Sequence, residues 1–374
     1  MSDFDDAVDE LNALGERSVP GTSLPPTPSP KLEHWLIEVS RLGATDLLLV
    51  AGAPPSARIE GGMVPLGGEA PLDGDDIVQA VLGALPPHAV RAFQNGAAVD
   101  ARLRTDLGRF RVNLHRERGR AAAAVRVQPA QPPRLGALNL PPGVEALSRI
   151  PRGLVLVGGA TGMGKTTTLA AFVDEINRRD RKHIVTIEDP IEYEHRHQAS
   201  IVEHVEIGID APDFPIALRA AVRQAPDVIV VGEMRDPETM QIALAAAETG
   251  HVVYSSVHTT DAASSVGRIA DAFPAERQAT VRQDLAMALA AIYVQTLLPR
   301  KGGGLVPAGE LLLMSYGARQ HVRKNALQHL HQEITLTRKA GSFTLEDSLN
   351  RLVRDGLIDR ADAVTRAVHP DEIL

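Results

Sequence analysis

The spacing of apolar and polar positions changes several times along the amino-terminal part of the chain. Residues 32–43 have the spacing of a helix that Gly43 should end, with apolar side chains on one face at Trp35, Leu36, Val39 and Leu42. The pattern then predicts a strand, a hairpin turning at Gly61 and Gly62, two helices and arginine-rich antiparallel strands, over residues 46–52, 56–66, 75–85, 87–96 and 99–129. Helices and strands mix here without β-α-β alternation, which predicts a small α+β domain.

A different pattern follows a proline-rich stretch. Four apolar runs alternate with helical segments, at residues 153–159, 183–189, 227–233 and 251–258. Runs that are buried on both faces and separated by helices predict a parallel α/β sheet. The tail after about residue 315 has helical spacing, and in it Thr344 and Asp347 predict a capping box for a helix that Gly356 ends.

These patterns divide the 374 residues into four segments. Residues 1–30 are acidic and then proline-rich, which favours an extended segment over a packed core, with a plain spacer and a partner-docking peptide as the two interpretations. We expect the α+β domain over residues 31–130, a linker over 131–145, and the α/β domain with its helical tail over 146–374.

Composition narrows the class of protein. The net charge of −8 argues against general nucleic-acid binding, and the absence of cysteine excludes disulfides and cysteine zinc sites. No apolar run reaches about 18 residues, so no membrane-spanning helix is expected. The first 16 residues carry six acids and no basic leader, which argues against a secretory signal. We therefore expect a cytoplasmic protein without direct membrane insertion.

A glycine-rich turn follows the first of the four apolar runs. Its residues fit G-x-x-x-x-G-K-[ST], between a predicted strand and a predicted helix. Backbone N–H groups of such a turn converge on a phosphate, and the helix N-terminus adds partial positive charge. Lys165 is expected to reach the β- and γ-phosphates, and Thr166 to ligate Mg²⁺. The predicted nucleotide-binding residues are Gly159, Ala160, Thr161, Gly162, Met163, Gly164, Lys165, Thr166 and Thr167.

Carboxylates follow two further strands. Glu188, Asp189 and Glu192 come at the end of one, and Glu233 at the end of another. Ligands of open α/β sheets bind at the carboxyl ends of strands, and several carboxylates there are costly without a cation. We expect Glu188, Asp189 and Glu233 to join Thr166 around Mg²⁺. An ordinary solvated strand end is the alternative for any one of these acids.

Two histidines flank the strand at residues 251–258. His258 stands at its carboxyl end beside Thr259 and Thr260, where it could sense the γ-phosphate. His251 stands at the other end and is weighed as a second site residue. A structural role is the alternative for both, since a lone histidine is more often structural.

Taken together, the motifs resemble those of the secretion ATPase superfamily, and within it those of the type IV pilus retraction (twitching motility) ATPases. The resemblance covers about residues 32–360. It rests on GATGMGKTTTLAA, on TIEDPIEYEH (the Asp box), on PDVIVVGEMRDPETMQIALAAAETGH (the Walker B segment) and on VHTTDAASSVGRI (the His box). Walker B segments of this family typically have Gly-Glu, which accounts for Gly232 where other phosphate-loop ATPases have Asp.

The resemblance implies a hexameric ring. Each subunit would have a PAS-like amino-terminal domain and a RecA-like carboxyl-terminal domain, with ATP at the subunit interface. Glu192 would polarise the attacking water, and Glu233 would serve the Mg²⁺–water network. Arginines of the amino-terminal domain would reach ATP, with solvated strand charge as the alternative for each. The matching residues are Arg109, Arg111, Arg116, Arg118 and Arg126.

The function implied is a Mg²⁺-dependent ATPase motor for pilus retraction and twitching motility. Such a motor is cytoplasmic and peripheral at the inner membrane, with an inner-membrane platform protein and a paralogous motor subunit as partners. Pilus extension and type II secretion ATPases commonly carry a four-cysteine zinc motif, so its absence favours the retraction branch. A pilus assembly or type II secretion ATPase, and a non-catalytic nucleotide-binding ring subunit, remain the alternatives.

Several positions depart from the family's pattern. Ala160 and Met163 stand where the family often has Pro and Ser, Leu48 where it usually has His, and Val205 where it usually has Arg. Residues 317–325, GARQHVRKN, match the family's AIRNLIRE motif only loosely. These departures bear on the partner and the motor task more than on the ATPase chemistry.

Overall fold

The computed structural model describes residues 27–59, 62–129 and 131–374. Residues 1–26 of the predicted extension (1–30) and the predicted turn residue Gly61 lie outside the described residues. Contacts divide the chain between residues 131 and 132 into two compact units, called here the amino-terminal and carboxyl-terminal units. Each unit is described by itself.

The described part of the amino-terminal unit is built on an antiparallel sheet with the strand order β3-β2-β1-β6-β5-β4. Three helices supply apolar side chains to its core, where Trp35, Ile77 and Phe93 pack with Leu47 and Phe110 of the strands. The strands are β1 (Asp46–Val50), β2 (Ser56–Ile59), β3 (Gly62–Pro65), β4 (Val99–Thr105), β5 (Gly108–Glu117) and β6 (Arg120–Gln128), and the helices are α2 (Pro30–Arg41), α3 (Gly74–Val81) and α4 (Pro87–Gln94).

The predicted elements of this unit are confirmed, with two local differences. Gly62 pairs with Ile59, so it begins β3 and does not belong to the turn. Leu42 is the C-cap residue of α2 and is 38% exposed, although its spacing placed it on the apolar face of the helix.

The carboxyl-terminal unit has a seven-stranded sheet with the order β13-β12-β7-β11-β10-β8-β9. The six strands numbered β7 through β12 all pair in parallel with one another. β13 pairs antiparallel with β12. The four predicted strands are confirmed as β7 (Gly153–Gly158), β8 (His183–Glu188), β10 (Val228–Val231) and β11 (Val252–Val257), and the structure adds β9 (Ile201–Glu206), β12 (Leu289–Pro299) and β13 (Leu305–Leu313).

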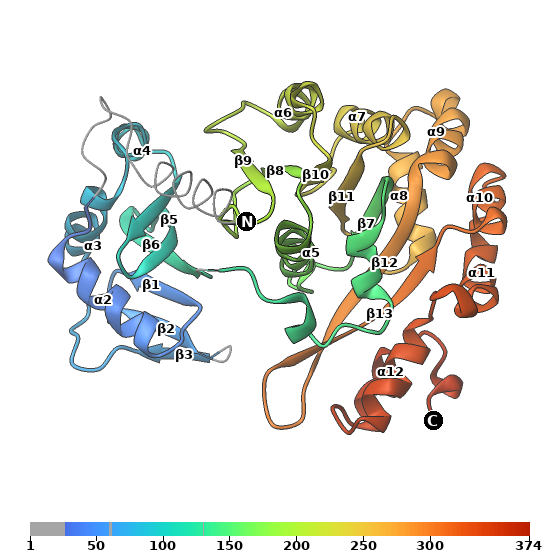
Figure 1. Ribbon diagram of the computed structural model, residues 1–374. Coiled ribbons are helices and arrows are strands. Elements are labelled where there is room, and N and C mark those ends of the chain that lie inside the picture. The colour runs from blue at the N-terminus through green and yellow to red at the C-terminus, as the bar shows by residue number, and fades with distance from the viewer. Residues whose placement is uncertain (1–26, 60–61, 130) are drawn as a thin grey trace. The chain divides into compact units, whose positions relative to one another are not determined.

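Helices cover both faces of this sheet (Figure 1). Successive side chains of β7 point to opposite faces: Leu154 and Leu156 pack with the helices α6–α9, and Val155 and Val157 pack with α5. Strands buried in this way are uniformly apolar, as the sequence predicted. The helices are α5 (Lys165–Arg179), α6 (Phe214–Ala221), α7 (Pro237–Glu248), α8 (Ala262–Asp271) and α9 (Ala275–Ala288).

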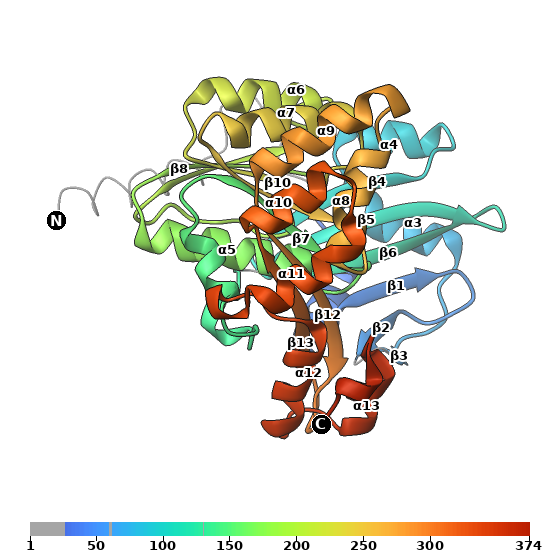
Figure 2. The same ribbon diagram turned by 90° about the vertical axis from the view of Figure 1, so that its right-hand side faces the viewer.

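The tail is helical as predicted, and its last two α-helices extend the core. Thr344 and Asp347 form the predicted capping box, and Gly356 follows the helix with φ 68°. α12 and α13 lie beside the far ends of β12 and β13 (Figure 2), where Leu349 and Leu352 pack with Leu298. The helices are α10 (Tyr316–Arg323), α11 (Leu330–Leu336), α12 (Leu345–Arg354) and α13 (Arg360–Arg366).

The segment expected to be a linker contributes to the core of the carboxyl-terminal unit. Leu135, Leu140 and Val144 are buried on the α5 side of the sheet.

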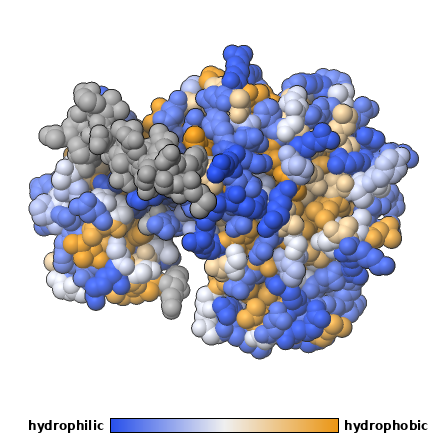
Figure 3. All heavy atoms as spheres, in the orientation of Figure 1, coloured by the Kyte–Doolittle hydropathy of each residue, from blue (hydrophilic) through white to orange (hydrophobic). Residues whose placement is uncertain are grey.

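Short 3-10 helices of the two units lie at Leu82–Ala84, Leu135–Ala137, Val144–Arg149, Val222–Gln224, Leu327–His329, Arg338–Ala340 and Pro370–Glu372. In the view of Figure 3 the surface of each unit is mostly hydrophilic, with small groups of hydrophobic side chains. Within the described ranges, no helix has the length and apolar character needed to cross a membrane.

Candidate nucleotide site

The predicted site residues of the carboxyl-terminal unit gather at one edge of its sheet. β7, β11, β10 and β8 are consecutive neighbours and parallel, so their carboxyl ends meet. These four strands lead into the glycine turn at residues 159–164, His258, Glu233 and Glu188, respectively. Side chains far apart in the sequence are therefore brought into one row.

The glycine turn needs glycine at three positions. Gly159, Gly162 and Gly164 have φ values of 146°, 80° and 76°, in the region that side chains with a Cβ rarely adopt. Gly164 is the N-cap of α5, and no side chain caps this helix. The first-turn N–H groups of α5 therefore face a turn without a carboxylate cap, which suits an anion.

Lys165 is buried inside the turn. Its Nζ donates hydrogen bonds to the carbonyl oxygens of Gly159, at 2.9 Å, and Ala160, at 3.0 Å. Burial lowers the pKa of Lys165, and the charges of Glu233 and Glu192 oppose that effect in part. The ammonium is held by weak neutral acceptors, which phosphate oxygens can replace with stronger charge-assisted bonds.

His258 connects this turn to Glu233. Its Nε2 lies 3.2 Å from Glu233 Oε1, while its Nδ1 lies 3.4 Å from both Thr161 Oγ1 and Lys165 Nζ. Burial alone would raise the pKa of Glu233, but the neighbouring Arg235, together with His258, more than offsets it, and the net shift is downward. The carboxylate of Glu233 is therefore kept ionised next to the turn.

The close approach of two strands explains glycine at position 232. A Cβ on Gly232 would lie 3.3 Å from the carbonyl oxygen of Ile187 and 3.5 Å from Cα of Glu188. Its backbone is held there, since Gly232 N donates to Ile187 O at 2.8 Å and Ser256 Oγ donates to Gly232 O at 2.6 Å. A side chain at this position would be crowded by β8, which favours glycine there.

The Asp box forms a loop that presents Glu192. Glu192 is exposed, whereas its neighbours Ile191 and Tyr193 are buried. The backbone N–H of Ile191 donates to Glu206 Oε2 at 2.8 Å, and the Tyr193 hydroxyl lies 3.1 Å from Thr167 Oγ1 on α5. Glu206 and α5 thus hold the backbone on either side of Glu192.

The two other acids of this loop have basic neighbours. His204 Nδ1 lies 3.7 Å from Glu188 Oε1. The pKa of Arg235 is raised, first by Glu233 and to a smaller extent by the charge of Asp189. Arg235, to which the sequence motifs assigned no role, therefore lies in the field of both acidic segments.

The five predicted arginines of the amino-terminal unit do not all lie on the same face of its sheet. The β5–β6 register sets Arg111 opposite Arg126, and Arg109 lies two residues before Arg111, so all three share a face. Arg111 Nε is 3.2 Å from Asp100 Oδ1, and Arg126 Nε is 3.0 Å from Asp46 Oδ1. Three of the five predicted arginines are thus brought together.

The other two arginines lie elsewhere. The guanidinium of Arg116 stacks over the ring of Phe93, 4.7 Å from its centroid, on the face covered by helices. Arg118 lies in the β5–β6 turn with φ 47° and pairs with Glu117 at 3.0 Å. Their positions separate them from the group of three.

His251 does not lie with the site residues. It precedes β11 at the amino end of the strand, and its Nδ1 is 3.0 Å from the carbonyl oxygen of Ala246 in α7. The imidazole stabilises the end of a helix, which is the structural alternative.

Gln295 on β12 contacts the glycine turn, although it belongs to none of the sequence motifs. Its Nε2 donates to the carbonyl oxygen of Met163 at 2.7 Å, and its Oε1 accepts from Thr168 Oγ1 at 2.8 Å. Only the pairing of β12 beside β7 brings it there. An apolar run over 289–294, directly before Gln295, was the one available signal for that strand.

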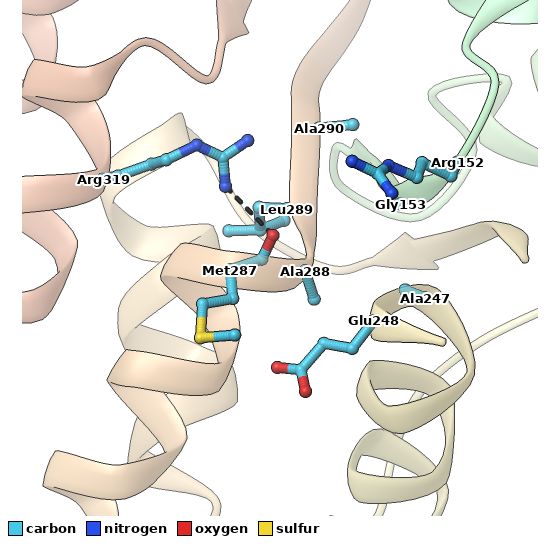
Figure 4. Close-up of a pocket in the computed structure, with 9 residues that line it drawn as sticks. All are labelled: Arg152, Gly153, Ala247, Glu248, Met287, Ala288, Leu289, Ala290 and Arg319. Atoms are coloured by element: carbon cyan, nitrogen blue, oxygen red, sulfur yellow. Dashed lines mark hydrogen bonds between the residues drawn. The ribbon is translucent and has the colours of Figure 1, made fainter. Parts of the chain in front are cut away.

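A cavity of about 360 Å³ lies at the opposite edge of the sheet (Figure 4). Arg319 of α10 donates to the carbonyl oxygen of Met287 at 3.1 Å and caps the carboxyl end of α9. Gly153 and Leu289, which begin β7 and β12, also line it, so it is separate from the site. The lining residues are Arg152, Gly153, Ala247, Glu248, Met287, Ala288, Leu289, Ala290 and Arg319.

Comparison with known proteins gives consistent matches. The family model for type II/IV secretion system proteins matches residues 139–346. The type IV pilus retraction ATPase PilT of Pseudomonas aeruginosa is 38% identical over 89% of this chain and 96% of its own length. The type IV pilus ATPase PilU of the same organism is 37% identical over 87% and 85%. A crystal structure of the pilus retraction motor PilT with bound ADP is 41% identical, with a TM-score of 0.84, over 91% of this chain and 98% of that one.

Proposed function

The chain belongs to the type II/IV secretion ATPase family, in its pilus retraction branch, and we propose that it hydrolyses ATP to power type IV pilus retraction and twitching motility. The observation that carries this proposal is the joining of Lys165, His258 and Glu233 at one edge of the sheet. A phosphate-binding lysine and an ionised carboxylate, connected by one imidazole, suit the hydrolysis of a nucleoside triphosphate.

The residues present fit the phosphates of a nucleotide. The uncapped amino end of α5 and the buried Lys165 offer donors to phosphate, and Thr161 and Met163 belong to the same turn. When bound, Mg²⁺ would neutralise phosphate charge. We propose that Thr166, Glu188, Asp189 and Glu233 hold it, directly or through water. The nucleotide-binding set is Gly159, Ala160, Thr161, Gly162, Met163, Gly164, Lys165, Thr166 and Thr167.

Three side chains would act on the reacting groups. Glu192, presented by its anchored loop, would orient and polarise the attacking water. Glu233 would accept hydrogen bonds from the water network, since its lowered pKa keeps it ionised. His258 would respond to the γ-phosphate, because it touches both the glycine turn and Glu233.

Assembly into a homohexamer would complete the site. In this proposal the amino-terminal unit is a PAS-like domain and the carboxyl-terminal unit is RecA-like, with ATP bound between subunits. The arginine that reaches the neighbour's ATP would be one of Arg109, Arg111 and Arg126, because these three share a face of the sheet. Arg116 and Arg118 are the less favoured candidates. Rotation of one unit against the other would be passed to an inner-membrane platform protein, with the motor cytoplasmic and peripheral at that membrane.

A second candidate function is supported by the near-equal identity to PilU. The chain is 37% identical to PilU and 38% identical to PilT. It could therefore be the paralogous ATPase subunit that works beside a retraction motor. A subunit of that kind would restore retraction only when the motor is also present, so complementation of single and double deletion strains separates the two functions.

The enzymatic part is tested by Lys165→Ala and Glu233→Gln. We expect each to lower steady-state ATP hydrolysis at least roughly 100-fold, with Lys339→Ala, an exposed lysine, as the control. Hydrolysis at the parent's rate by either variant would show that the residue is wrongly assigned. Oligomeric state measured on the same sample tests the ring: full turnover by a monomer would rule it out.

A further inference from the structure

We propose that Gln295 is a positioning residue for nucleotide binding, because its side-chain amide sets the direction of a backbone N–H group in the glycine turn. The inference rests on the proposed ATPase function. It concerns a residue outside every motif by which that function was predicted.

Gln295 is buried between the turn and the first turn of α5. It is 4% exposed. Its Nε2 donates to Met163 O at 2.7 Å, and its Oε1 accepts from Thr168 Oγ1 at 2.8 Å. Both ends of one amide group are used, so its orientation is determined.

The turn lies directly against β12 at this point. A Cβ on Gly159 would come within 2.6 Å of the carbonyl oxygen of Gln295, and a Cβ on Gly164 within 2.9 Å of its Nε2. The Met163 sulfur lies 3.3 Å from the backbone nitrogen of Leu297. The glycines therefore serve contact with β12 as well as contact with phosphate.

The geometry of the peptide bond turns this contact into a directional effect. In a trans peptide the C=O and the following N–H point in opposite directions. When Gln295 holds the carbonyl of Met163 toward β12, the N–H of Gly164 points away from β12. Gly164 is the N-cap of α5, the place from which a glycine turn donates to phosphate.

Gln295 thereby keeps a phosphate donor in position before the nucleotide arrives. If that carbonyl were released, the peptide between Met163 and Gly164 could flip and point an oxygen toward the phosphate. Binding would then have to reverse the flip, which weakens the affinity for nucleotide.

The test compares three variants of the full-length protein. Gln295→Met removes both hydrogen bonds at nearly constant length. Gln295→Glu keeps the acceptor for Thr168 and replaces the donor to Met163 O with an oxygen. Thr168→Val removes the other bond alone. The measurements are equilibrium binding of a fluorescent ADP analogue, and KM and kcat for ATP.

We expect both Gln295 variants to weaken ADP binding and raise KM roughly tenfold, with kcat within about threefold of the parent. Thr168→Val should weaken binding only about twofold, because the bond to Met163 O remains. Gln332→Met, the same substitution at an exposed glutamine of α11, is the matched control, and its affinity for ADP should stay within about twofold of the parent.

Two results would overturn the inference. The first is parental ADP affinity in either folded Gln295 variant, even with a lowered Tm, because Gln295 would then serve packing alone. The second is an equal loss of affinity in Thr168→Val and Gln295→Glu, because the direction of the Met163 carbonyl would then not matter. A parent that binds ADP but does not hydrolyse ATP would instead overturn the proposed function and leave this comparison valid.

Discussion

His258 Nε2 lies 3.2 Å from Glu233 Oε1, and the other nitrogen of the same imidazole lies 3.4 Å from Lys165 Nζ. One side chain thus touches both Lys165, which we propose binds phosphate, and the carboxylate of Glu233. The three residues follow three different strands, β7, β11 and β10. The two contacts therefore form only when these strands are paired in register. The imidazole is therefore a direct physical connection between the glycine turn and Glu233.

Removal of the imidazole should slow hydrolysis more than it weakens binding. For His258→Ala we expect kcat to fall roughly tenfold or more, with ADP affinity within about threefold of the parent. Steady-state kinetics and ADP titration check this. His251→Ala is the matched control, since His251 lies at the other end of β11 and its loss should change kcat less than about twofold. A larger fall in the control would contradict the assignment.

Arg235→Ala should move the acid limb of the pH–rate profile to higher pH. The ion pair at 2.9 Å helps to keep the pKa of Glu233 low against the effect of burial. Without it the pKa rises, so protonation of Glu233 and loss of kcat begin at a higher pH. The profile of kcat between pH 5 and 8 checks the shift, with Arg219→Ala, whose partner is Glu238 on the surface, as control. Overlapping acid limbs for Arg235→Ala and parent would contradict it.

Glu206→Ala should disable the loop that presents Glu192. The mutation leaves the backbone N–H of Ile191 without its acceptor. We expect kcat to fall at least roughly tenfold, with ADP affinity nearly unchanged, because the glycine turn is not touched. Glu203→Ala removes a half-exposed carboxylate of the same strand and should keep parental kcat. If both variants lose kcat equally, β9 rather than Glu206 is responsible.

Glu310→Gln should flatten the dependence of stability on pH. Burial raises the pKa of Glu310 to about 7 from an ordinary 4.5; the N–H of Ala262 opposes this, and Asp261 and Glu346 add to it. Between these values the folded protein binds more protons than the unfolded one. The free energy of unfolding should therefore fall as pH rises from 4.5 to 7, by about 3 kcal/mol.

Urea denaturation of the parent and of Glu310→Gln at pH 5, 6 and 7 measures this slope. Glu276→Gln, an exposed carboxylate on α9, should keep the parent's slope. A parent whose stability is constant or rises over this interval would show that Glu310 does not titrate as inferred.

Rings assembled from a mixture of two inactive variants should recover ATP hydrolysis if the arginines of one subunit act on ATP bound by its neighbour. Arg111→Ala and Glu233→Gln are each expected to lower hydrolysis by at least roughly 100-fold when alone. In a mixture, the intact site of the first variant can receive arginines from the second, so ATPase activity should exceed that of either variant. Arg118→Ala, in the β5–β6 turn, should hydrolyse ATP like the parent. No gain on mixing, in rings shown to exchange subunits, would contradict the arrangement.

Local chemistry made part of this molecule predictable from sequence. Uniform apolar runs predicted four central strands, and the capping pair Thr344 and Asp347 predicted the start of α12. β12 was not predicted, since α9 ends at Ala288 and the strand begins at Leu289 with no Gly or Pro between them. β9 was not predicted either, because its sequence, IVEHVE, contains two glutamates and a histidine and lacks the apolar run of the central strands.

The sequence by itself determined the glycine turn, its lysine, and the acids and histidine that end neighbouring strands, because residue type and spacing decide each of these over a few positions. Only the tertiary structure decided which of them meet. The strand order brought His258 to Glu233 and Gln295 to Met163, and cross-strand register sorted the arginines by face. Such contacts depend on how distant segments pair, and no short stretch of sequence encodes that pairing.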